Sequence, residues 1–536
     1  MADKYEVLKT YYGYDSFRDG QEQIIDRILM GQDVLAVMPT GSGKSLCYQI
    51  PAIMFPGITL VISPLISLMK DQVSALNQNG IRAAYLNSSL TSRQYTMALD
   101  NIKKVVYKII YVAPERLITD SFKQLAMGLD ISFIAVDEAH CVSQWGHDFR
   151  TSYTKISDFY ESLKKRPTVA AFTATATKHV KDDIRIFLKL RLAYEITTGF
   201  DRPNLYFGVC EPEDKIGYIV DYLTANKDRS GIIYAMTRKN VENIHRELLG
   251  RGFPVTYYHA GLGDEERNAN QESFIRDKTP IMIATNAFGM GIDKPDVSFI
   301  LHFNMPLSME AYYQEAGRAG RDGGESDCIL LFSPADIHLA KFLLENSTED
   351  DPVLDAEELE LLKKKRFSRL RDMIQYCRTA GCLRRYILRY FGEEPESKPC
   401  AKCSSCRSEY DAVDATDIAV AVGIAIEATG ERYGAMFVAD YLHGTQSGRP
   451  NQLGYSDGRA FGLLSDVPVG LILEVIEQMV ESGLLLKCGG KYPVLGITPV
   501  LGRRRKKEAF RPMLSFPIQR SRRSQRRVRR TDAPCL

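Results

Sequence analysis

The chain has 536 residues, 45% hydrophobic and 25% charged, a composition typical of soluble globular proteins with three or four domains. It has no run of about 18 apolar residues, which excludes a membrane-spanning helix, and its first residues lack the basic-then-apolar layout of a secretory signal. We therefore expect a cytosolic protein. The formal net charge of +2 conceals a split, because residues 503–536 carry 13 Lys and Arg residues against two acidic residues. A polyanionic partner would have to meet local basic surfaces or this tail.

Apolar segments of strand length alternate with helical stretches through the first 340 residues. The first set comprises Asp33–Thr40, Ile58–Pro64, Lys108–Pro114, Phe133–His140 and Thr168–Thr175. After a charged connector, the second set comprises Gly231–Thr237, Val255–Gly261, Pro280–Asn286, Val297–Pro306 and Cys328–Pro334. Such segments are typical of parallel strands buried on both faces. Two sets in series, joined at Glu211–Lys215, predict an α/β protein with two doubly wound lobes and a cleft between them.

The pattern changes after residue 340. Residues 355–392 are predicted to be helical, with basic residues that either touch nucleic acid or face solvent: Lys363, Lys364, Lys365, Arg366, Arg369 and Arg371. Residues 412–500 are predicted to contain helices at Asp417–Glu427 and Pro468–Glu481 and a hairpin, Leu484–Thr498, turning near Gly489–Gly490. Helices followed by a short hairpin favour a winged-helix module. Beyond Gly502 no apolar periodicity remains, and we predict a disordered tail.

These features divide the chain into five predicted parts. They are the lobes 1–207 and 208–340, a helical and cysteine-rich subdomain 341–409, a winged-helix domain 410–502 and a basic tail 503–536. The tail either adds phosphate contacts to a nucleic-acid partner, is a solvated appendage, or results from an altered reading frame.

A glycine-rich segment, Met38-Pro-Thr-Gly-Ser-Gly-Lys44-Ser45, follows the first predicted strand and opens a helix. In this context a P-loop binds phosphate, because backbone N–H groups and the helix dipole face the anion. Lys44 is predicted to reach the β- and γ-phosphates, and Ser45 to bind Mg²⁺. Met38 stands where the pattern has glycine, so an ordinary loop is the alternative. The predicted phosphate-binding residues are Thr40, Gly41, Ser42, Gly43, Lys44 and Ser45.

Two further segments carry groups suited to phosphoryl transfer. In Ala135-Val-Asp137-Glu138-Ala139-His140, Asp137 can hold the metal and Glu138 can polarise the attacking water. Gln314-Glu-Ala-Gly-Arg318-Ala-Gly-Arg321 puts two arginines on one face of a helical turn in the second lobe. Either arginine, placed across a cleft, can stabilise charge on the transferred phosphoryl group and make hydrolysis depend on cleft closure. The alternatives are a solvated acid pair and surface salt bridges.

The 11 cysteines are scattered along the chain, which argues against a disulfide scaffold, but four of them cluster at Cys382, Cys400, Cys403 and Cys406. Zinc prefers four thiolates at this CxxC spacing, and an iron–sulfur cluster is the competing possibility. Cys377 is a rival first ligand.

In this order the motifs resemble those of superfamily 2 helicases, and more closely those of the RecQ family of DNA helicases. The resemblance covers about residues 5–500 and is carried by Phe17–Gln21, Ser63–Gln72, Ala113–Leu117, Asp137–Arg150, Thr173–Thr175, Tyr258–Gly261, Ala287–Gly291 and Gln314–Arg321. It implies two RecA-like lobes, a helical subdomain in which Cys382 and its three partners hold one structural Zn²⁺, and a winged helix that binds duplex at the fork.

The resemblance also implies roles for individual residues. It assigns adenine recognition to Tyr14, Arg18 and Gln21, and it assigns further nucleotide contacts to Gly291 and Asp293. Coupling of the nucleotide site to DNA falls to Thr173, Thr175 and an aromatic-rich loop with Gln144, Trp145, His147, Phe149 and Arg150. Bases stack on aromatic faces, so this loop can report bound single strand to the acid pair. Tyr492 either stacks on the terminal base pair or belongs to the core of the wing.

The implied function is an ATP- and Mg²⁺-dependent helicase that moves 3′→5′ on single-stranded DNA and unwinds duplex. The implied setting is DNA repair, recombination and replication, including the SOS response, in the cytoplasm or at the nucleoid. We expect a monomer acting on single-stranded and forked DNA, with single-strand-binding and repair proteins as partners and no membrane partner. Many members carry a further helical nucleic-acid-binding domain, which we do not expect in this chain. The alternatives are an RNA-directed ATPase and an ATP-gated remodelling factor that does not separate strands.

Overall fold

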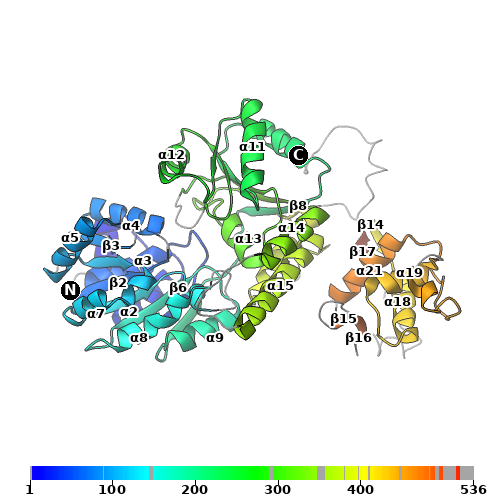
Figure 1. Ribbon diagram of the computed structural model, residues 1–536, viewed down its shortest axis with the longest axis horizontal. Helices are drawn as coiled ribbons and strands as arrows, with labels where there is room; N and C mark the ends of the chain where they lie inside the picture. The colour runs from blue at the N-terminus through cyan, green and yellow to red at the C-terminus, as the bar shows by residue number, and fades with distance from the viewer. Residues whose placement is uncertain are drawn as a thin grey trace. The chain divides into compact units, whose positions relative to one another are not determined.

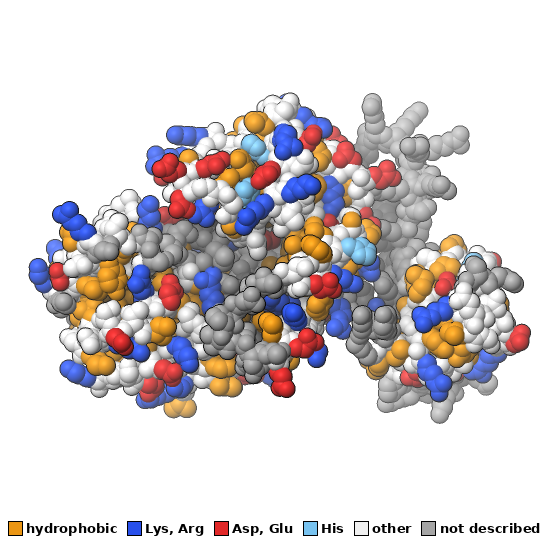
Figure 2. All heavy atoms as spheres, viewed as in Figure 1, with side chains coloured by type: hydrophobic (Ala, Val, Ile, Leu, Met, Phe, Trp, Pro, Cys, Tyr) orange, Lys and Arg blue, Asp and Glu red, His pale blue; other side chains and the backbone are white. Residues whose placement is uncertain are grey.

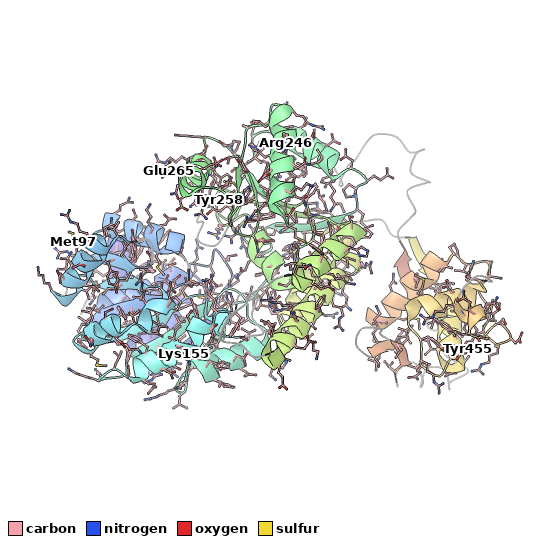
Figure 3. All side chains as sticks on the ribbon, viewed as in Figure 1. Met97, Lys155, Arg246, Tyr258, Glu265 and Tyr455 are labelled. Atoms are coloured by element: carbon pink, nitrogen blue, oxygen red, sulfur yellow. The ribbon has the colours of Figure 1, made fainter. Side chains whose placement is uncertain are left out.

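The computed structural model describes residues 3–64, 66–87, 90–104, 106–143, 149–288, 294–346, 356–379, 381–395, 398–407, 411–445, 449–481, 483–488, 494–498 and 515–518. The chain forms two compact units, residues 1–406 and residues 407–534. Unit 1 holds two sheets with their helices, drawn from blue to green in Figure 1. Figure 3 labels Met97 and Lys155 in the first lobe, Arg246 and Glu265 in the second, and Tyr455 in unit 2.

Lobe 1 is built on a parallel seven-stranded sheet in the order β3-β4-β2-β5-β6-β1-β7. Its strands are β1 (Val34–Val37), β2 (Ile58–Ile62), β3 (Ala83–Leu86), β4 (Ile109–Val112), β5 (Ile131–Val136), β6 (Thr168–Thr173) and β7 (Tyr194–Thr197). Its helices are α1 (Lys4–Tyr12), α2 (Gln21–Leu29), α3 (Lys44–Met54), α4 (Ile66–Gln78), α5 (Ser92–Lys103), α6 (Pro114–Leu117), α7 (Asp120–Met127), η1 (Ala139–Val142), η2 (Thr151–Lys155), α8 (Ile156–Glu161) and α9 (Lys178–Phe187). Every residue of β1, β2 and β4 is buried, which explains their continuous apolar sequences.

Lobe 2 is built on a parallel six-stranded sheet in the order β10-β11-β9-β12-β13-β8. Its strands are β8 (Leu205–Cys210), β9 (Gly231–Tyr234), β10 (Val255–Tyr258), β11 (Ile281–Ala284), β12 (Phe299–His302) and β13 (Ser326–Leu331). Its helices are α10 (Lys215–Ala225), α11 (Arg238–Gly250), α12 (Asp264–Ile275), α13 (Met309–Ala316) and α14 (Pro334–Glu345). The predicted fold class, two parallel α/β lobes in series, is therefore confirmed.

The connection between the lobes differs from the prediction. Strand β7 pairs with β1 in lobe 1, and β8 pairs with β13 in lobe 2, so residues 198–204 form the linker. The segment expected to join the lobes, Glu211–Lys215, instead follows β8 and ends at the first residue of α10, and the predicted boundary at 207 falls inside β8. Strand β8 was missed because it pairs with a strand more than 100 residues away along the chain, a contact without a local signal.

Among the described residues from 356 to 407, three helices follow lobe 2, namely α15 (Ala356–Arg378), α16 (Leu383–Tyr390) and α17 (Ser404–Arg407). The basic side chains of α15 do not share one environment, because Lys364 is exposed beside Glu360 whereas Lys365 is buried. Burial lowers the pKa of Lys365. The basic stretch is therefore not a uniform solvated face. Across the visible surface of unit 1, Lys and Arg side chains are interspersed with acidic ones (Figure 2).

Unit 2 packs its helices around one apolar core. Its elements are β14 (Asp411–Asp414), α18 (Thr416–Ala428), α19 (Ala435–His443), α20 (Arg449–Gln452), α21 (Val469–Glu481), β15 (Leu485–Cys488), β16 (Val494–Ile497) and β17 (Ser515–Ile518). The predicted hairpin is present as the antiparallel pair β15–β16, although Tyr492 and the turn lie outside the described residues. The prediction of a tail without structure is wrong for β17, which pairs antiparallel with β14. The prediction failed because a strand of four residues can be held by pairing with a distant strand, without an apolar periodicity in its own sequence.

Candidate nucleotide site and zinc centre

The P-loop, residues 38–45, joins β1 to α3 and has the tight geometry that its glycines predict. Gly43 has a φ of 81°, and a Cβ atom there would lie 2.4 Å from Gln21 Nε2. The Ser42 hydroxyl donates to the Pro39 carbonyl oxygen at 2.7 Å. The left-handed backbone at Gly43 and the close packing of Gln21 explain why this position requires glycine.

Residues of the early motif support the P-loop from outside. Gln21 is buried, and its Nε2 donates to the carbonyl oxygens of Ser42 and Gly43 at 3.0 and 3.1 Å. Its Oε1 accepts the Arg18 N–H at 2.9 Å, and Arg18 Nη1 donates to the Gly41 carbonyl at 2.6 Å. Both ends of the Gln21 amide are thus bonded to the chain itself. Tyr14, which is 54% exposed, lines a cavity that borders the P-loop.

The acid pair lies at the end of β5, beside the P-loop lysine. Lys44 Nζ lies 3.8 Å from Glu138 Oε1, and Glu138 has the unusual φ of 47°. Burial raises the pKa of Asp137 to about 6; the Glu138 carboxylate acts in the same direction and Lys44 opposes it. Two carboxyl groups on neighbouring residues, one of them buried, form a site that favours a cation. The donor set therefore fits Mg²⁺, with Asp137 as its protein carboxylate and Ser45 lining the same cavity.

His140 links the acid pair to Thr173 at the end of β6. Burial, with the charges of Lys44 and Arg150, lowers the pKa of His140 to about 3, so the imidazole is neutral. The Thr173 hydroxyl donates to the Thr175 carbonyl at 3.1 Å and lies 2.9 Å from His140 Nδ1. Nδ1 is then the donor to Thr173, and the same nitrogen lies 3.3 Å from Glu138 Oε2, which has no hydrogen-bond partner among the described residues. A polar path thus runs from Thr173 to the residue beside the metal site.

The predicted arginines come from lobe 2 and meet the P-loop. We call residues 317–324 the arginine loop. A Cβ atom at Gly41 would lie 3.2 Å from Arg321 Cγ, and the Thr40 hydroxyl donates to the Gly317 carbonyl at 3.0 Å. Arg318 is buried, and its Nε has no hydrogen-bond partner among the described residues. The cavity that Tyr14 lines has a volume of about 600 Å³. It is also lined by residues of both lobes: Lys44, Ser45, Asp137, Glu138, Gln314, Arg318 and Arg321.

Part of the predicted DNA-coupling loop can be placed. Phe149 and Arg150 are partly buried, and Arg150 Nη1 donates to the Pro64 carbonyl at 3.3 Å. Gln144, Trp145 and His147 lie outside the described residues. The same holds for two predicted nucleotide contacts, Gly291 and Asp293.

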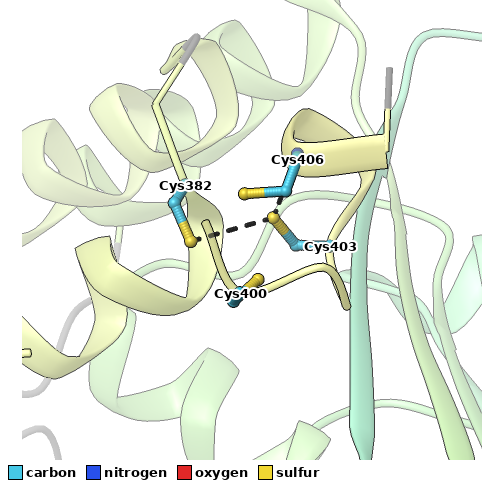
Figure 4. A group of neighbouring side chains, drawn as sticks. All are labelled: Cys382, Cys400, Cys403 and Cys406. Atoms are coloured by element: carbon cyan, nitrogen blue, oxygen red, sulfur yellow. Dashed lines mark hydrogen bonds between the residues drawn. The ribbon is translucent and has the colours of Figure 1, made fainter. Parts of the chain in front are cut away.

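The four clustered cysteines converge as the spacing predicts (Figure 4). The Sγ atoms of Cys382, Cys400, Cys403 and Cys406 all lie within 4.8 Å of one another, and Cys377 is not part of the group. Backbone N–H groups of Arg385, Lys402 and Cys406 donate to the sulfurs of Cys382, Cys400 and Cys403 at 3.4–3.5 Å.

The thiols of the cluster interact with one another. A hydrogen bond from the Cys403 thiol lowers the pKa of Cys382 to about 4 and raises the pKa of Cys403. Four converging sulfurs, three of which accept backbone N–H groups, form a donor set that fits a structural Zn²⁺.

Residues 398–407, which we call the zinc loop, are anchored on lobe 2. Cys403 forms a parallel bridge with Phe207 of β8, and the Ser404 hydroxyl accepts the Val209 N–H at 3.2 Å. Lys402 Nζ donates to the Pro203 carbonyl at 2.9 Å and pairs with Glu325 at 2.6 Å. The metal centre therefore borders the outer edge of the lobe 2 sheet and the linker.

Two linker residues that sequence reasoning missed contact the nucleotide site. Arg202 donates to the P-loop carbonyl of Thr40 and to carbonyls of the arginine loop, and Asn204 donates to the same loop. Their only sequence signal is the polar, proline-containing stretch Asp201–Asn204 between the two sets of strands. Their hydrogen-bond acceptors are backbone carbonyl oxygens. Every residue has one, so the sequence does not indicate these contacts.

Family models match the chain in the order of its domains. They are the DEAD/DEAH box helicase at residues 18–183, the helicase conserved C-terminal domain at 214–323, the RecQ zinc-binding region at 334–407 and the RQC domain at 409–522. The RQC match extends past Gly502 and includes β17.

Solved structures of helicases share the two-lobe fold. Saccharomyces cerevisiae Dbp5 bound to RNA and ADP BeF3 aligns with a TM-score of 0.53 and 17% identity, over 68% of this chain and 97% of that one. The DUF1998 helicase MrfA bound to DNA aligns with a TM-score of 0.54 and 18% identity, over 74% and 60%. At such low identity these likenesses concern the fold alone. No helix among the described residues combines the length and apolar character needed to cross a membrane.

Curated relatives are similar over most of the chain. The ATP-dependent DNA helicase RecQ of Bacillus subtilis is 43% identical over 493 residues, 92% of this chain and 82% of that protein. The RecQ of Pasteurella multocida is 40% identical over 481 residues, 90% and 74%. With the P-loop, the acid pair and the arginine loop around one cavity and a four-cysteine centre at the edge of the lobe 2 sheet, the chain belongs to the RecQ family of helicases.

Proposed function

We propose that this protein is an ATP-dependent DNA helicase that moves 3′→5′ on single-stranded DNA and unwinds duplex. One observation carries the proposal: a single cavity of about 600 Å³ is lined by phosphate-binding and acidic residues of lobe 1 and by arginines of lobe 2. Hydrolysis at such a site changes the contacts between the lobes, and cyclic lobe motion is what translocation requires.

The residues of the cavity have distinct proposed roles. Lys44 and the P-loop amides hold the β- and γ-phosphates, while Asp137 and Ser45 hold Mg²⁺, which when bound supplies positive charge to the phosphate oxygens. Glu138 orients the attacking water, and the neutral His140 lies 3.3 Å from that carboxylate. Arg321, with Arg318, stabilises the charge that develops on the transferred phosphoryl group.

Adenine recognition is proposed for Tyr14 and Arg18, which line the cavity next to the P-loop. Tyr14 offers an exposed aromatic face on which a base can stack. Gln21 contributes by fixing the P-loop carbonyls, and base pairing by its amide would require one of its present hydrogen bonds to be exchanged. Gly291 and Asp293 are proposed as further nucleotide contacts on the basis of sequence.

Communication with DNA is proposed to run through the aromatic-rich loop, residues 144–150. The loop follows η1, which begins directly after Glu138, and Arg150 N–H donates to the Cys141 carbonyl at 2.9 Å. Thr173 reaches the same region through His140. A change in the loop on binding single strand can therefore reach the acid pair through a few bonded residues.

Replacing Trp145 with alanine is expected to lower the stimulation of ATPase activity by single-stranded DNA by about tenfold or more, because a stacked base contributes about 1–3 kcal/mol. The measurement is the ratio of ATPase rates with and without oligonucleotide. Trp145→Phe, which keeps an aromatic face, serves as the matched control and retains most of the ratio. A ratio in Trp145→Ala equal to that of the wild type would remove Trp145 from the coupling path.

Unit 2 is proposed to bind duplex at the fork and to separate strands with the β15–β16 hairpin, with Tyr492 near its turn. The 13 basic residues of the tail can add phosphate contacts. We further propose a monomer that works at DNA in the cytoplasm or nucleoid, during repair, recombination, replication and the SOS response, together with single-strand-binding and repair proteins.

A strand-displacement assay tests the proposed function. Wild-type protein with ATP and Mg²⁺ is expected to unwind a DNA duplex with a 3′ single-stranded tail, and Lys44→Ala is expected to be inactive. A matched RNA duplex and a 5′-tailed DNA duplex complete the comparison. Preference for the RNA duplex would indicate an RNA-directed ATPase, and DNA-stimulated hydrolysis without strand separation would indicate a remodelling factor.

A further inference from the structure

Arg202 in the linker joins the two halves of the nucleotide site. Its Nη1 donates to the Thr40 carbonyl of the P-loop at 2.9 Å and to the Gly317 carbonyl at 3.3 Å. Its Nη2 donates to the carbonyls of Ala319 and Gly320 at 3.0 and 2.9 Å. One guanidinium group thus gathers four backbone oxygens, one from lobe 1 and three from the loop that carries Arg318 and Arg321.

Arg202 is half-buried, and its bonding differs from that of an arginine in a salt bridge. In the described part of the chain no carboxylate pairs with it, and burial lowers its pKa. Removing a charged group from water costs free energy when only carbonyl oxygens bind it. We therefore attribute the position of Arg202 to the arrangement of backbone carbonyls that its hydrogen bonds fix. The planar fork of guanidinium reaches several fixed acceptors at once, which the single ammonium nitrogen of lysine cannot do.

Asn204, two residues after Arg202, also donates hydrogen bonds to the arginine loop. Its Nδ2 donates to the carbonyls of Gly320 and Gly324, both at 2.9 Å. A Cβ atom at Gly317 would lie 2.3 Å from the Thr40 hydroxyl oxygen, so the arginine loop packs against the P-loop with no room for a side chain there. The linker and the P-loop together therefore determine the path of the arginine loop.

The linker is itself held in place next to the zinc centre. Arg384 of α16, which is buried, pairs with Asp201 at 2.5 Å and donates to the carbonyls of Arg202 at 2.7 Å and of Leu205. Its guanidinium also lies 5.4 Å from the ring centroid of Phe207. Arg384 follows the predicted zinc ligand Cys382 by two residues, so the linker is anchored to the helix that begins at the cysteine cluster.

We propose that Arg202 is the positioning residue that presents the arginine loop to the phosphates, and that Asn204 is its auxiliary. By binding Thr40 and the loop simultaneously, Arg202 makes the placement of Arg318 and Arg321 depend on the P-loop of the other lobe. The inference rests on the proposed ATP hydrolysis and deepens it. Arg202 acts on the turnover of bound ATP and contributes little to its affinity, because it contacts the P-loop at one carbonyl only.

A mutant cycle tests this role. Arg202→Ala is expected to lower kcat of DNA-stimulated ATP hydrolysis about 10²-fold, the cost of a misplaced catalytic group, while the Kd of a fluorescent non-hydrolysable ATP analogue changes less than threefold. In the Arg318→Ala/Arg321→Ala background the same change is expected to lower kcat less than threefold, because no arginine remains to be positioned. Arg202→Lys is expected to lose at least tenfold, and Asn204→Ala about tenfold, in the otherwise wild-type chain.

Arg229 provides the matched control, because it is a lobe 2 arginine that bonds Asp327 and the Ser298 carbonyl away from the arginine loop. Whatever effect Arg229→Lys has on kcat is expected to be the same in both backgrounds. Zinc content and melting temperature verify that each variant is folded, and Arg202→Lys and Asn204→Ala serve if Arg202→Ala does not fold.

The outcomes separate the inference from the proposed function. An equal loss of kcat from Arg202→Ala in both backgrounds, or a wild-type kcat in Arg202→Lys, would overturn the positioning role while wild-type ATPase activity persists. A wild-type chain without DNA-stimulated ATPase activity would instead refute the proposed function itself.

Discussion

Arg321→Ala is expected to lower kcat of DNA-stimulated ATP hydrolysis by about 10³-fold or more, with a much smaller effect on the affinity for ATP. The aliphatic stem of Arg321 lies against Gly41 of the P-loop, and Arg321 lines the cavity with Lys44 and the acid pair. Its charge counts most when negative charge develops on the transferred phosphoryl group, so its removal affects the transition state more than the ground state.

Steady-state ATPase kinetics and binding of an ATP analogue measure the two effects separately. Arg276→Ala is the matched control, since this lobe 2 arginine is 64% exposed and pairs with Glu272 on α12, away from the cavity. Its kcat is expected to equal that of the wild type. A loss below tenfold in Arg321→Ala, with Arg318 intact, would show that Arg321 does not supply the charge, and Arg318→Ala would then be the next variant to measure.

Cys403→Ser is expected to abolish stoichiometric zinc binding and to unfold the zinc loop. Structural zinc sites contribute about 10–16 kcal/mol of binding free energy, as much as the whole stability of a typical domain. Cys403 is buried and bridges to Phe207, so the loss also uncovers the edge of the lobe 2 sheet at β8. Zinc content, limited proteolysis near residues 398–407 and the melting temperature measure these effects.

Cys377→Ala is the control for the zinc prediction, because Cys377 is also buried near the end of α15 but is not part of the cluster of sulfurs. It is expected to lose some stability and to retain one zinc ion per chain. Zinc retained by Cys403→Ser, or visible absorbance from stoichiometric iron in freshly purified wild-type protein, would contradict the assignment of a structural zinc site.

The local motifs were readable from the sequence because their chemistry depends on residues close together in the chain. The glycines of the P-loop, the Asp137-Glu138 pair and the CxxC spacing each place their groups within one turn or strand end. The continuous apolar strands predicted parallel sheets for the same reason, since burial on both faces requires apolar residues at successive positions. The family, the two-lobe fold and the helicase domains are confirmed by the comparisons.

Interactions between distant segments could not be read in this way. Strand β7 and strand β8 border the linker, and their membership of different sheets depends on pairing with β1 and β13. The bonds of Gln21 to the P-loop carbonyls likewise join segments about 20 residues apart through acceptors that every residue possesses. Backbone oxygens carry no sequence signature, so such contacts become visible only when the chain is folded.

The sequence by itself therefore identified the P-loop, the acid pair and the four clustered cysteines as candidate sites, because side-chain type and short spacing specify them. The tertiary structure alone decided how these groups are assembled. Arg202 lies in a connector without a motif, yet its guanidinium holds the P-loop of one lobe to the arginine loop of the other, and Arg384 beside the zinc centre holds the connector. The physical reason is that a guanidinium can bind several backbone carbonyls that converge only through long-range packing.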